Sequence, residues 1–283
     1  MLFVSNIVVA LPNGKRLVNQ ISFTAGRGEF VSILGSSGAG KSLTLRCIVG
    51  LTSPAEGEIK LISPDGRTYS TTNVGPKELR RARRHIGLIF QGSNLVKRLT
   101  VLENVMLGRL GYIHPLRSCL LGFKDSEAGE AMAALDRVNM AQYAARMAGS
   151  LSGGEMQRVS IARAIYQRPL IYLADEPISS LDPRNAEAIM SILQPLSRET
   201  PVIGAFHQPA IVARYCTRAI GIRTGQIVYD GPAQLSARQL EKIYGDMPDG
   251  PETVSHEPEM PPYLFEPGLQ PAMQQTLHEG VRI

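Results

Sequence analysis

Four short, mostly apolar runs recur along the chain. They span residues 30–34, 86–90, 170–174 and 202–206. Runs of about five such residues are typical of strands buried on both faces of a parallel sheet. In open α/β sheets, ligands bind where the strands reach their carboxyl ends. The residues that directly follow the four runs are therefore expected to converge on one site.

Outside these runs, the pattern predicts an antiparallel sheet at the N-terminus and a helical insertion in the middle of the chain. Residues 1–30 alternate apolar and polar positions, with turns at 12–14 and 26–28. Residues 100–147 have helical spacing and few strand signals. Further elements are expected in this order: a strand near 57–62, a basic helix near 76–84, a helix at 155–166, and alternating strands and helices to residue 244. The predicted fold class is α/β.

A glycine-rich loop follows the first run and matches the pattern GxxxxGK[ST]. Its residues are Gly35, Ser36, Ser37, Gly38, Ala39, Gly40, Lys41 and Ser42. A helical pattern then extends from Lys41 to about Gly50. Glycines let backbone N–H groups surround an anion, and the helix N-terminus adds its positive dipole end. We expect a nucleoside triphosphate here, with Lys41 on the β- and γ-phosphates and the Ser42 hydroxyl on Mg²⁺.

The other three runs end in polar residues suited to the same chemistry. Asp175 is expected to hold Mg²⁺, and Glu176 to accept a proton from the water that attacks the γ-phosphorus. Adjacent residues at a strand end point in different directions, so two carboxylates can take two roles. Gln91 is a further candidate ligand of Mg²⁺ or its water. His207 is placed to donate a hydrogen bond to developing charge.

A second glycine-containing loop precedes the helix expected at 155–166. Ser152, Gly153 and Gly154 form another potential anion-binding helix N-terminus. One copy of the chain already has a phosphate site in its first loop. The second loop is explained if two copies face each other head to tail, each giving this loop to the γ-phosphate of the other.

Composition and cysteine use limit the cellular setting. Apolar residues make up 43% of the 283 residues, but no run of about 18 apolar residues exists that would span a membrane. The N-terminus has no basic region and no small-residue cleavage site, so no secretory signal is expected. Cys47, Cys119 and Cys216 lie far apart without metal-like spacing, which fits a reducing cytoplasm.

The formal net charge of +5 is unevenly distributed. Residues 245–283 carry seven acids and one base, a net of −6, which leaves +11 for the rest. A basic body suits an anionic ligand, an anionic membrane surface or nucleic acid. The densest basic cluster, here interpreted either as a solvated helix face or as a docking surface, is Lys77, Arg80, Arg81, Arg83 and Arg84. Residues 246–283, acidic and proline-rich, are expected to be a disordered tail.

Together these motifs resemble the ATPase subunit of an ABC transporter over about residues 1–245. The matching motifs are the Walker A loop 35–42, Gln91, the signature Leu151–Glu155 with Gln157 and Arg158, the Walker B segment Ile171–Glu176, the D-loop Ser179–Asp182 and the switch His207. The resemblance implies a P-loop NTPase fold of the ABC type. It has a mixed sheet core, an antiparallel β subdomain and a helical subdomain at about 92–155.

The same resemblance implies ATP and Mg²⁺ as cofactors and a homodimer as the working form. Lys41, Glu176 and His207 are then catalytic, and Ser42, Gln91 and Asp175 hold the metal. Nucleotide contacts fall on the Walker A loop and on Leu43, Gln91, Ser152, Gly153, Gly154 and Asp182.

A narrower resemblance points to phosphonate-import ATPases. It rests on segments 94–105, 108–112, 117–118 and 122–123 and on the pair His207-Gln208. It implies a peripheral subunit on the cytoplasmic face of the inner membrane, coupled to an integral permease dimer and an extracytoplasmic substrate-binding protein. Nucleic acid is not an expected partner. The energised process would be uptake of phosphonates or related phosphorus oxyanions.

Three residues depart from the family pattern. Leu11 stands where an aromatic side chain commonly stacks on adenine, a loss on the order of 1 kcal/mol. Leu43 replaces a threonine whose hydroxyl helps to hold the α-phosphate, and Thr44 is rotated away by about 100°. Glu155 stands where glutamine is commoner in the signature. We expect weak ATP affinity in the isolated subunit.

Two alternatives remain at this point. An export or lipoprotein-release ATPase shares every motif and differs only around residues 92–125. A soluble ABC ATPase acting on nucleic acid or ribosomes suits the basic body. Only 59 residues (92–150) separate Gln91 from the signature, too few for the coiled coils of chromosome and repair versions. Translation-factor versions have two cassettes, and this chain has one.

Overall fold

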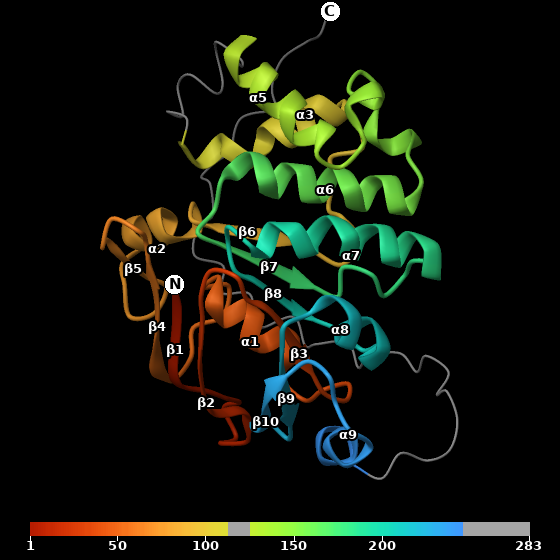
Figure 1. Ribbon diagram of the computed structural model, residues 1–283. Coiled ribbons are helices and arrows are strands. Elements are labelled where there is room, and N and C mark those ends of the chain that lie inside the picture. Colours follow the sequence, from red (N-terminus) through yellow and green to blue (C-terminus); the bar gives the residue numbers. More distant parts are fainter. Residues whose placement is uncertain (113–124, 246–283) are drawn as a thin grey trace, which may run out of the picture. The chain divides into compact units, whose positions relative to one another are not determined.

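The computed structural model describes residues 1–112 and 125–245 (Figure 1). Six strands form its main sheet: β3 (Phe30–Leu34), β6 (Ile86–Ile89), β7 (Ile171–Asp175), β8 (Val202–Ala205), β9 (Arg218–Arg223) and β10 (Gln226–Pro232). Their order is β10-β9-β3-β8-β7-β6, and all pairs are parallel except β9 with β10. Every residue of β3 and β8 is buried, as expected for strands covered on both faces.

The register of this sheet brings the carboxyl ends of four strands to one edge. Ala205 of β8 pairs with Ile33 of β3 and with Asp175 of β7. Ala174 of β7 pairs in turn with Ile89 of β6. The expected convergence of the four apolar runs is thereby confirmed.

A second, antiparallel sheet contains the N-terminal region. Its strands are β1 (Leu2–Ala10), β2 (Arg16–Ala25), β4 (Glu56–Ile62) and β5 (Thr68–Ser70), in the order β2-β1-β4-β5. The first two are the strands expected from the alternating pattern of residues 1–30. β5 was not predicted, because three residues are too few for a period to be recognised.

Helices cover both faces of the main sheet (Figure 1). They are α1 (Lys41–Ile48), α2 (Pro76–Arg83), α3 (Val101–Met106), α5 (Asp125–Asp136), α6 (Gly153–Gln167), α7 (Pro183–Ser197), α8 (Pro209–Tyr215) and α9 (Ala237–Tyr244). Among the described residues of the helical region are three short 3-10 helices, η1 (Leu107–Tyr112), η2 (Ala141–Tyr143) and η3 (Ala148–Ser150). Within the described residues, no helix combines the length and hydropathy that crossing a bilayer requires.

Two hydrophobic clusters hold these layers together. One joins α1 to the antiparallel sheet and one face of the main sheet, through residues such as Leu45, Ile48, Ile59 and Ile33. The other joins α3, α5, α6 and α7 to the opposite face. The predicted α/β fold with antiparallel and helical parts is confirmed.

Some of the sequence-based expectations fall outside the described residues. They concern the proposed tail 246–283, Cys119 and segments 117–118 and 122–123.

Candidate functional site

The loop Gly35–Ser42, hereafter the phosphate loop, connects β3 to α1. Gly35 has a φ of 154°, and a Cβ at this position would lie 2.3 Å from the carbonyl oxygen of Ile222, so only glycine fits. The α1 N-cap is Gly40 with a φ of 104°, and no side chain caps this helix. The backbone N–H groups at this N-terminus are therefore not covered by a side chain of the loop itself.

Lys41 is the charged residue of this loop, and only 4% of its surface is exposed. Its Nζ donates hydrogen bonds to the carbonyl oxygens of Gly35 (2.9 Å) and Ser36 (3.0 Å). These bonds draw the ammonium group back over its own loop. A buried cation held on loop carbonyls is suited to binding an anion enclosed by the same loop.

Four of the predicted side chains meet in two pairs at the carboxyl edge of the sheet. Ser42 Oγ donates to Asp175 Oδ1 at 2.7 Å, across 133 residues of sequence. Glu176 Oε1 lies 2.5 Å from His207 Nε2. The expectation that Asp175 and Glu176 point to different partners is confirmed, and the left-handed backbone of Glu176 (φ 48°) accompanies this divergence.

The environment of Glu176 keeps its carboxylate ionised. The hydrogen bond from His207 lowers the pKa of Glu176, burial opposes that shift, and the nearby Lys41 ammonium lowers the pKa further. The side chain of Glu176 is 15% exposed and that of His207 is 40% exposed. A charged, partly buried carboxylate with a histidine partner can accept a proton at neutral pH.

The oxygens of Ser42 and Asp175 fit a magnesium ion. Both are hard oxygen donors, 2.7 Å apart, at the N-terminus of α1. No group of three or more His, Cys, Asp or Glu residues within the described chain forms a metal cage. That combination suits Mg²⁺, which is commonly held by one or two protein groups together with water and phosphate oxygens.

Gln91 lies on an exposed loop directly after β6 and contacts the segment that follows Glu176. Its Nε2 donates to Ser179 Oγ at 3.2 Å, and Ser179 Oγ donates to the carbonyl oxygen of Glu176 at 3.2 Å. Gln91 is therefore linked to the backbone of the candidate base through one hydroxyl. Sequence reasoning did not predict this role of Ser179.

The loop after Gln91 holds three successive residues in left-handed conformations. They are Gly92 (φ 74°), Ser93 (φ 60°) and Asn94 (φ 45°). Left-handed conformations cost about 1 kcal/mol or more for residues with a side chain. The Arg163 guanidinium on α6 stabilises them by donating to the carbonyl oxygens of Asn94 (2.9 Å) and Ser93 (3.0 Å). Sequence reasoning missed Arg163, because its partners lie about 70 residues away.

In the segment Leu151–Glu155, hereafter the signature loop, the Glu155 carboxylate accepts hydrogen bonds from Ser152 of the same loop. Ser152 is the N-cap of α6, and both its backbone N–H (2.8 Å) and its Oγ (2.7 Å) donate to Glu155 Oε2. The Glu155 N–H donates back to Ser152 Oγ at 3.4 Å, which completes a capping box. The backbone hydrogen bond from Ser152 is the main cause that lowers the pKa of Glu155.

Asp182 lies beside the signature loop. It is the N-cap of α7, where Oδ1 accepts from the Asn185 N–H at 3.0 Å and Oδ2 from Asn185 Nδ2 at 2.6 Å. A Cβ added to Gly154 would lie 2.8 Å from Asn185 Oδ1. Gly154 therefore lets α6 pack closely against this amide.

The residues that depart from the family pattern have clear structural positions. Leu43 is partly buried and packs against the hydrophobic cluster around α1. The Thr44 hydroxyl is buried and donates to the carbonyl oxygen of Gly40 at 2.8 Å, so it is engaged within the helix. Leu11 lies in the turn after β1 and is partly exposed.

A groove of about 350 Å³ lies next to the Gln91 loop. Leu88, Phe90 and Leu107 give it apolar walls, and Arg163 and Gln167 of α6 also line it. The groove therefore borders both the strand that leads to Gln91 and the helix that begins at the signature loop. An apolar segment of a partner that bound here would contact both elements.

Known proteins resemble this chain over most of its length. Residues 18–179 match the profile described as ABC transporter. The phosphonates import ATP-binding protein PhnC 1 of Ruegeria sp. (strain TM1040) is 41% identical over 251 residues, covering 88% of this chain and 96% of that protein. PhnC of Bordetella parapertussis is 44% identical over 245 residues, covering 86% and 95%.

A solved structure agrees with this relationship. The ATP-binding cassette MJ0796, in a dimeric post-hydrolysis state bound to ADP and Pi, is 33% identical with a TM-score of 0.68. The match covers 82% of this chain and 99% of that one. The fold observed here is therefore that of an ATP-binding cassette.

Proposed function

This chain belongs to the ABC transporter family as an ATP-binding, ATP-hydrolysing subunit, and from that premise we propose that it energises the import of a phosphonate or a related phosphorus oxyanion. The observation that carries the catalytic part is the meeting of Ser42 with Asp175 and of Glu176 with His207 at one edge of the sheet. The relatives' similarity over nearly their whole length supports the choice of cargo.

The phosphate loop binds the triphosphate of ATP through its backbone N–H groups and through Lys41. Because Lys41 is buried against the loop, its charge acts in a low-dielectric setting. Ser42 and Asp175 would hold Mg²⁺, which, when bound, neutralises charge on the β- and γ-phosphates. Gln91 is the third residue proposed to contact the metal or its water.

Glu176 is the proposed general base. Its carboxylate accepts the proton of the attacking water, and the ionised state it needs is stabilised by His207 and Lys41. His207 contacts the Glu176 carboxylate. We propose that it also donates a hydrogen bond to charge that develops on the γ-phosphate.

A complete site requires a second copy of the chain. Ser152, Gly153 and Gly154 of one subunit are proposed to bind the γ-phosphate held by the phosphate loop of the other. Asp182 would lie beside them at the same interface, because it anchors Asn185 against Gly154. The related cassette MJ0796 has a dimeric structure, which supports a dimer as the working form.

The groove lined by Leu88, Phe90 and Leu107 is the proposed docking site of an integral permease dimer. A permease segment in this groove would contact the strand that ends before Gln91. Nucleotide-dependent movement of Gln91 would then reach the permease directly. An extracytoplasmic binding protein would deliver the cargo, and the subunit would be peripheral on the cytoplasmic face of the inner membrane.

We assign the ATP-binding domain to residues 1–245, with a helical subdomain at about 92–155. An export or lipoprotein-release system uses the same ATP chemistry and is the main alternative. The relatives favour import, because both are phosphonates import ATP-binding proteins. Nucleic acid is not proposed as a partner.

Deletion of the gene tests the cargo most directly. The deletion strain should fail to grow when methylphosphonate or phosphite is the sole phosphorus source, and should grow normally on inorganic phosphate. A plasmid copy of the wild-type gene should restore growth, whereas the Lys41→Ala copy should not. The matched control is Lys60→Ala on β4, where the lysine side chain is partly exposed, and it should restore growth like the wild type. Normal growth of the deletion strain on every phosphonate and on phosphite would contradict the proposed cargo.

A further inference from the structure

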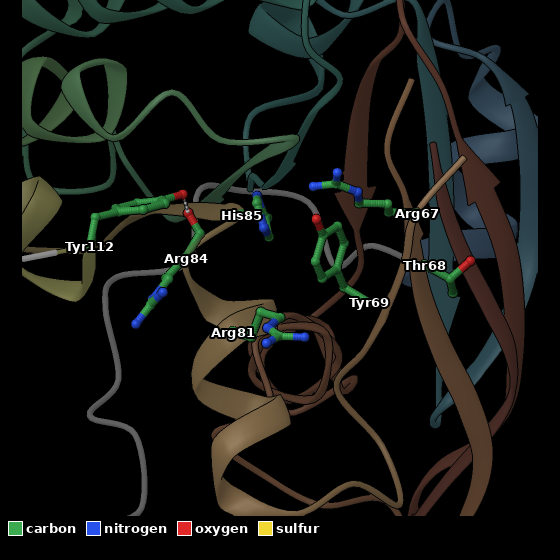
Figure 2. A pocket seen from close by; sticks show the side chains of 7 residues that line it. All are labelled: Arg67, Thr68, Tyr69, Arg81, Arg84, His85 and Tyr112. Carbon is green, nitrogen blue, oxygen red and sulfur yellow. Dashed lines mark hydrogen bonds between the residues drawn. The ribbon is translucent and has the colours of Figure 1, made fainter. Parts of the chain in front are cut away.

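A second pocket lies on α2, β5 and η1, and none of the residues of the candidate ATP site lines it. Figure 2 shows Arg67 and Tyr69 on one side, Arg84 and Tyr112 on the other, and His85 between them. Its volume is about 640 Å³. The lining side chains that can bind a ligand through charge or aromatic contact are three arginines and three rings: Arg67, Arg81, Arg84, Tyr69, His85 and Tyr112. None of the described residues that line it is acidic.

The three rings form a continuous aromatic wall. The Tyr69 and His85 rings have centroids 4.1 Å apart, and the Tyr112 ring meets His85 edge-on at 6.5 Å. Tyr112 is fixed by a hydrogen bond from its hydroxyl to the carbonyl oxygen of Arg84 at 2.7 Å. Such a wall offers flat apolar surface to the carbon part of a ligand.

The arginines of this pocket differ from those of the groove beside Gln91. In the groove, Arg83 donates to the carbonyl oxygens of Val49 and Gly50, and Arg163 donates to those of Ser93 and Asn94. Those guanidinium groups hold backbone in place. Their role in the groove is structural.

Arg81 and Arg84 have no comparable partners. Within residues 1–112 and 125–245, neither guanidinium group forms an ion pair or a hydrogen bond to a carbonyl group. The Nε of Arg84 is buried without a hydrogen-bond partner, and its Cζ lies 5.5 Å from the centroid of the Tyr112 ring. Arg67, at the rim, pairs with Asp65 at 3.1 Å. The pocket thus has about two uncompensated positive charges, which favour an anion.

The size and charge of the pocket specify the anion more closely. A guanidinium group binds phosphate through paired N–H donors, and a phosphate monoester carries roughly −1.5 to −2 charge at pH 7. That charge balances Arg81 and Arg84, whereas a single carboxylate leaves one cation unmatched. A volume of 640 Å³ exceeds the needs of phosphate alone and lies within the usual range of small-molecule sites, about 300–1,000 Å³.

We propose that this pocket binds a small organic phosphate or phosphonate, with its dianionic head on Arg81 and Arg84 and its carbon part against the Tyr69, His85 and Tyr112 rings. The site is separate from the phosphate loop. The proposal does not require the proposed cargo or the permease to be correct.

Phenylphosphonate is a suitable probe because it joins a dianion to one ring. The full-length Lys41→Ala protein is titrated, so that the phosphate loop does not contribute, and binding is followed by calorimetry and by the NMR signal of the His85 ring. His85 is assigned by His85→Gln. Burial and the Arg84 charge lower the pKa of His85, while Asp65 raises it, and the Tyr69 and Tyr112 rings complete its surroundings. Bound dianion should shift this pKa upward by about half a unit or more.

Two variants and a control locate the binding. Arg81→Gln, at an exposed position, and Arg84→Gln should each weaken phenylphosphonate at least tenfold. Arg80→Gln, an exposed arginine of the same helix outside the pocket, should leave the affinity unchanged. Circular dichroism and the melting temperature verify that each variant is folded.

The proposal is overturned if Arg81→Gln and Arg84→Gln bind phenylphosphonate as the parent does. Equal affinity for inorganic phosphate and phenylphosphonate would rule out the organic ligand class. If a glutamate-rich hexapeptide shifts His85 and phenylphosphonate does not, the pocket docks an acidic protein segment instead. Failure of growth complementation by the Lys41→Ala gene, by contrast, reports only on the ATP site.

Discussion

Two glycine-containing helix N-termini in this molecule look alike in sequence and differ in how they are completed. The N-terminus of α1 has a glycine N-cap and no side-chain cap, with the Lys41 ammonium folded over its loop. The N-terminus of α6 has a serine N-cap whose N–H and hydroxyl both donate to Glu155. The first is open to an anion and supplies a positive charge. The second already holds a carboxylate.

This difference indicates how two anion sites can share one phosphate. We propose that the α1 site binds phosphate without a second subunit, because its donors and its charge come from one loop. In the proposed dimer, the hydrogen bonds from Ser152 to the Glu155 carboxylate would have to break before Ser152 could donate to a phosphate oxygen. Such a loop is expected to contribute little binding free energy by itself. It contributes when it contacts a nucleotide that is bound to a second subunit.

Among the substitutions that test this comparison, removal of the Lys41 side chain should have the largest effect on ATP turnover. Lys41→Ala takes the only charged side chain from the phosphate loop, so ATP turnover should fall by roughly 10³-fold or more. Stability should fall by about 1–3 kcal/mol, because the carbonyl groups of Gly35 and Ser36 lose a buried donor. ATPase assays and urea unfolding measure the two effects.

The control for that change is Lys60→Ala. Lys60 forms an exposed ion pair with Glu58, and such pairs are worth about 0–1 kcal/mol. Turnover in this variant should stay within twofold of the wild type. A fully active Lys41→Ala protein would remove the distinction between the two N-termini.

Glu176→Gln should stabilise the ATP-bound dimer, in which the α1 and α6 N-termini of different copies are proposed to face the same nucleotide. The amide keeps the shape of the side chain but cannot accept the proton, so turnover should fall by about 10²-fold or more. Dimers with bound ATP should accumulate in size-exclusion chromatography with light scattering. Glu187→Gln, at an exposed position paired with Arg214, should behave as the wild type. Dimers of Glu176→Gln that dissociate under ATP as readily as the wild type would contradict the assigned base.

Glu155→Gln should make the second N-terminus more like the first. The neutral amide removes the negative charge at the place where a phosphate must approach, a change worth about 1 kcal/mol. ATP-dependent dimerisation in the Glu176→Gln background should therefore tighten by roughly fivefold. Analytical ultracentrifugation at several ATP concentrations gives the dimerisation constant.

The chain supplies a matched control for this change. Thr100 and Glu103 form the same kind of capping box at the start of α3, and the hydrogen bonds from Thr100 likewise lower the pKa of Glu103. A depressed folded-state pKa stabilises above the unfolded pKa, and this contribution is lost as the pH falls through the folded value. Both Glu103→Gln and Glu155→Gln should thus reduce the acid dependence of unfolding. If Glu103→Gln also tightens dimerisation, the charge at Glu155 is not the cause.

The smallest expected effect concerns binding of the adenine ring of ATP rather than binding of its phosphates. Leu11→Tyr should add ring stacking on adenine worth on the order of 1 kcal/mol, and so lower the dissociation constant for ATP about fivefold. Titration with a fluorescent ATP analogue measures the constant, and Leu11→Met is a suitable apolar control. An unchanged constant would show that Leu11 is not the stacking position.

The phosphate loop and its partners could be predicted from the sequence because local rules determine them. The buried runs place Asp175, Glu176 and His207 at the carboxyl ends of parallel strands and Ser42 at the start of the helix that follows another such strand, and strand ends share an edge. The link from Gln91 through Ser179 and the support of Ser93 and Asn94 by Arg163 could not be predicted. These contacts join loops and helices about 70–90 residues apart, and no periodic pattern encodes them.

The capping box of α6 is an intermediate case. The spacing of Ser152 and Glu155 is a known signal for a helix start. The structure adds a second consequence, because the Glu155 carboxylate accepts hydrogen bonds from the same Ser152 donors that we propose for the γ-phosphate. The basic cluster on α2 divides similarly: Arg83 holds backbone carbonyl groups, while Arg81 and Arg84 line a pocket with residues from two other elements.

Mixed subunits test most directly whether the α6 N-terminus of one copy completes the α1 site of the other. Lys41→Ala and Ser152→Ala proteins should each be inactive alone. In a mixed dimer both defects fall on one site and the second site is intact, so equal mixing should restore about a quarter of wild-type ATPase activity. When the Lys41→Ala/Ser152→Ala double variant is mixed equally with wild type, every mixed dimer has two damaged sites. Only the wild-type dimers are then active and about a quarter of the activity should remain, whereas sites contained within one subunit would leave about half. No recovery in the first mixture, or full activity of Ser152→Ala alone, would contradict the account.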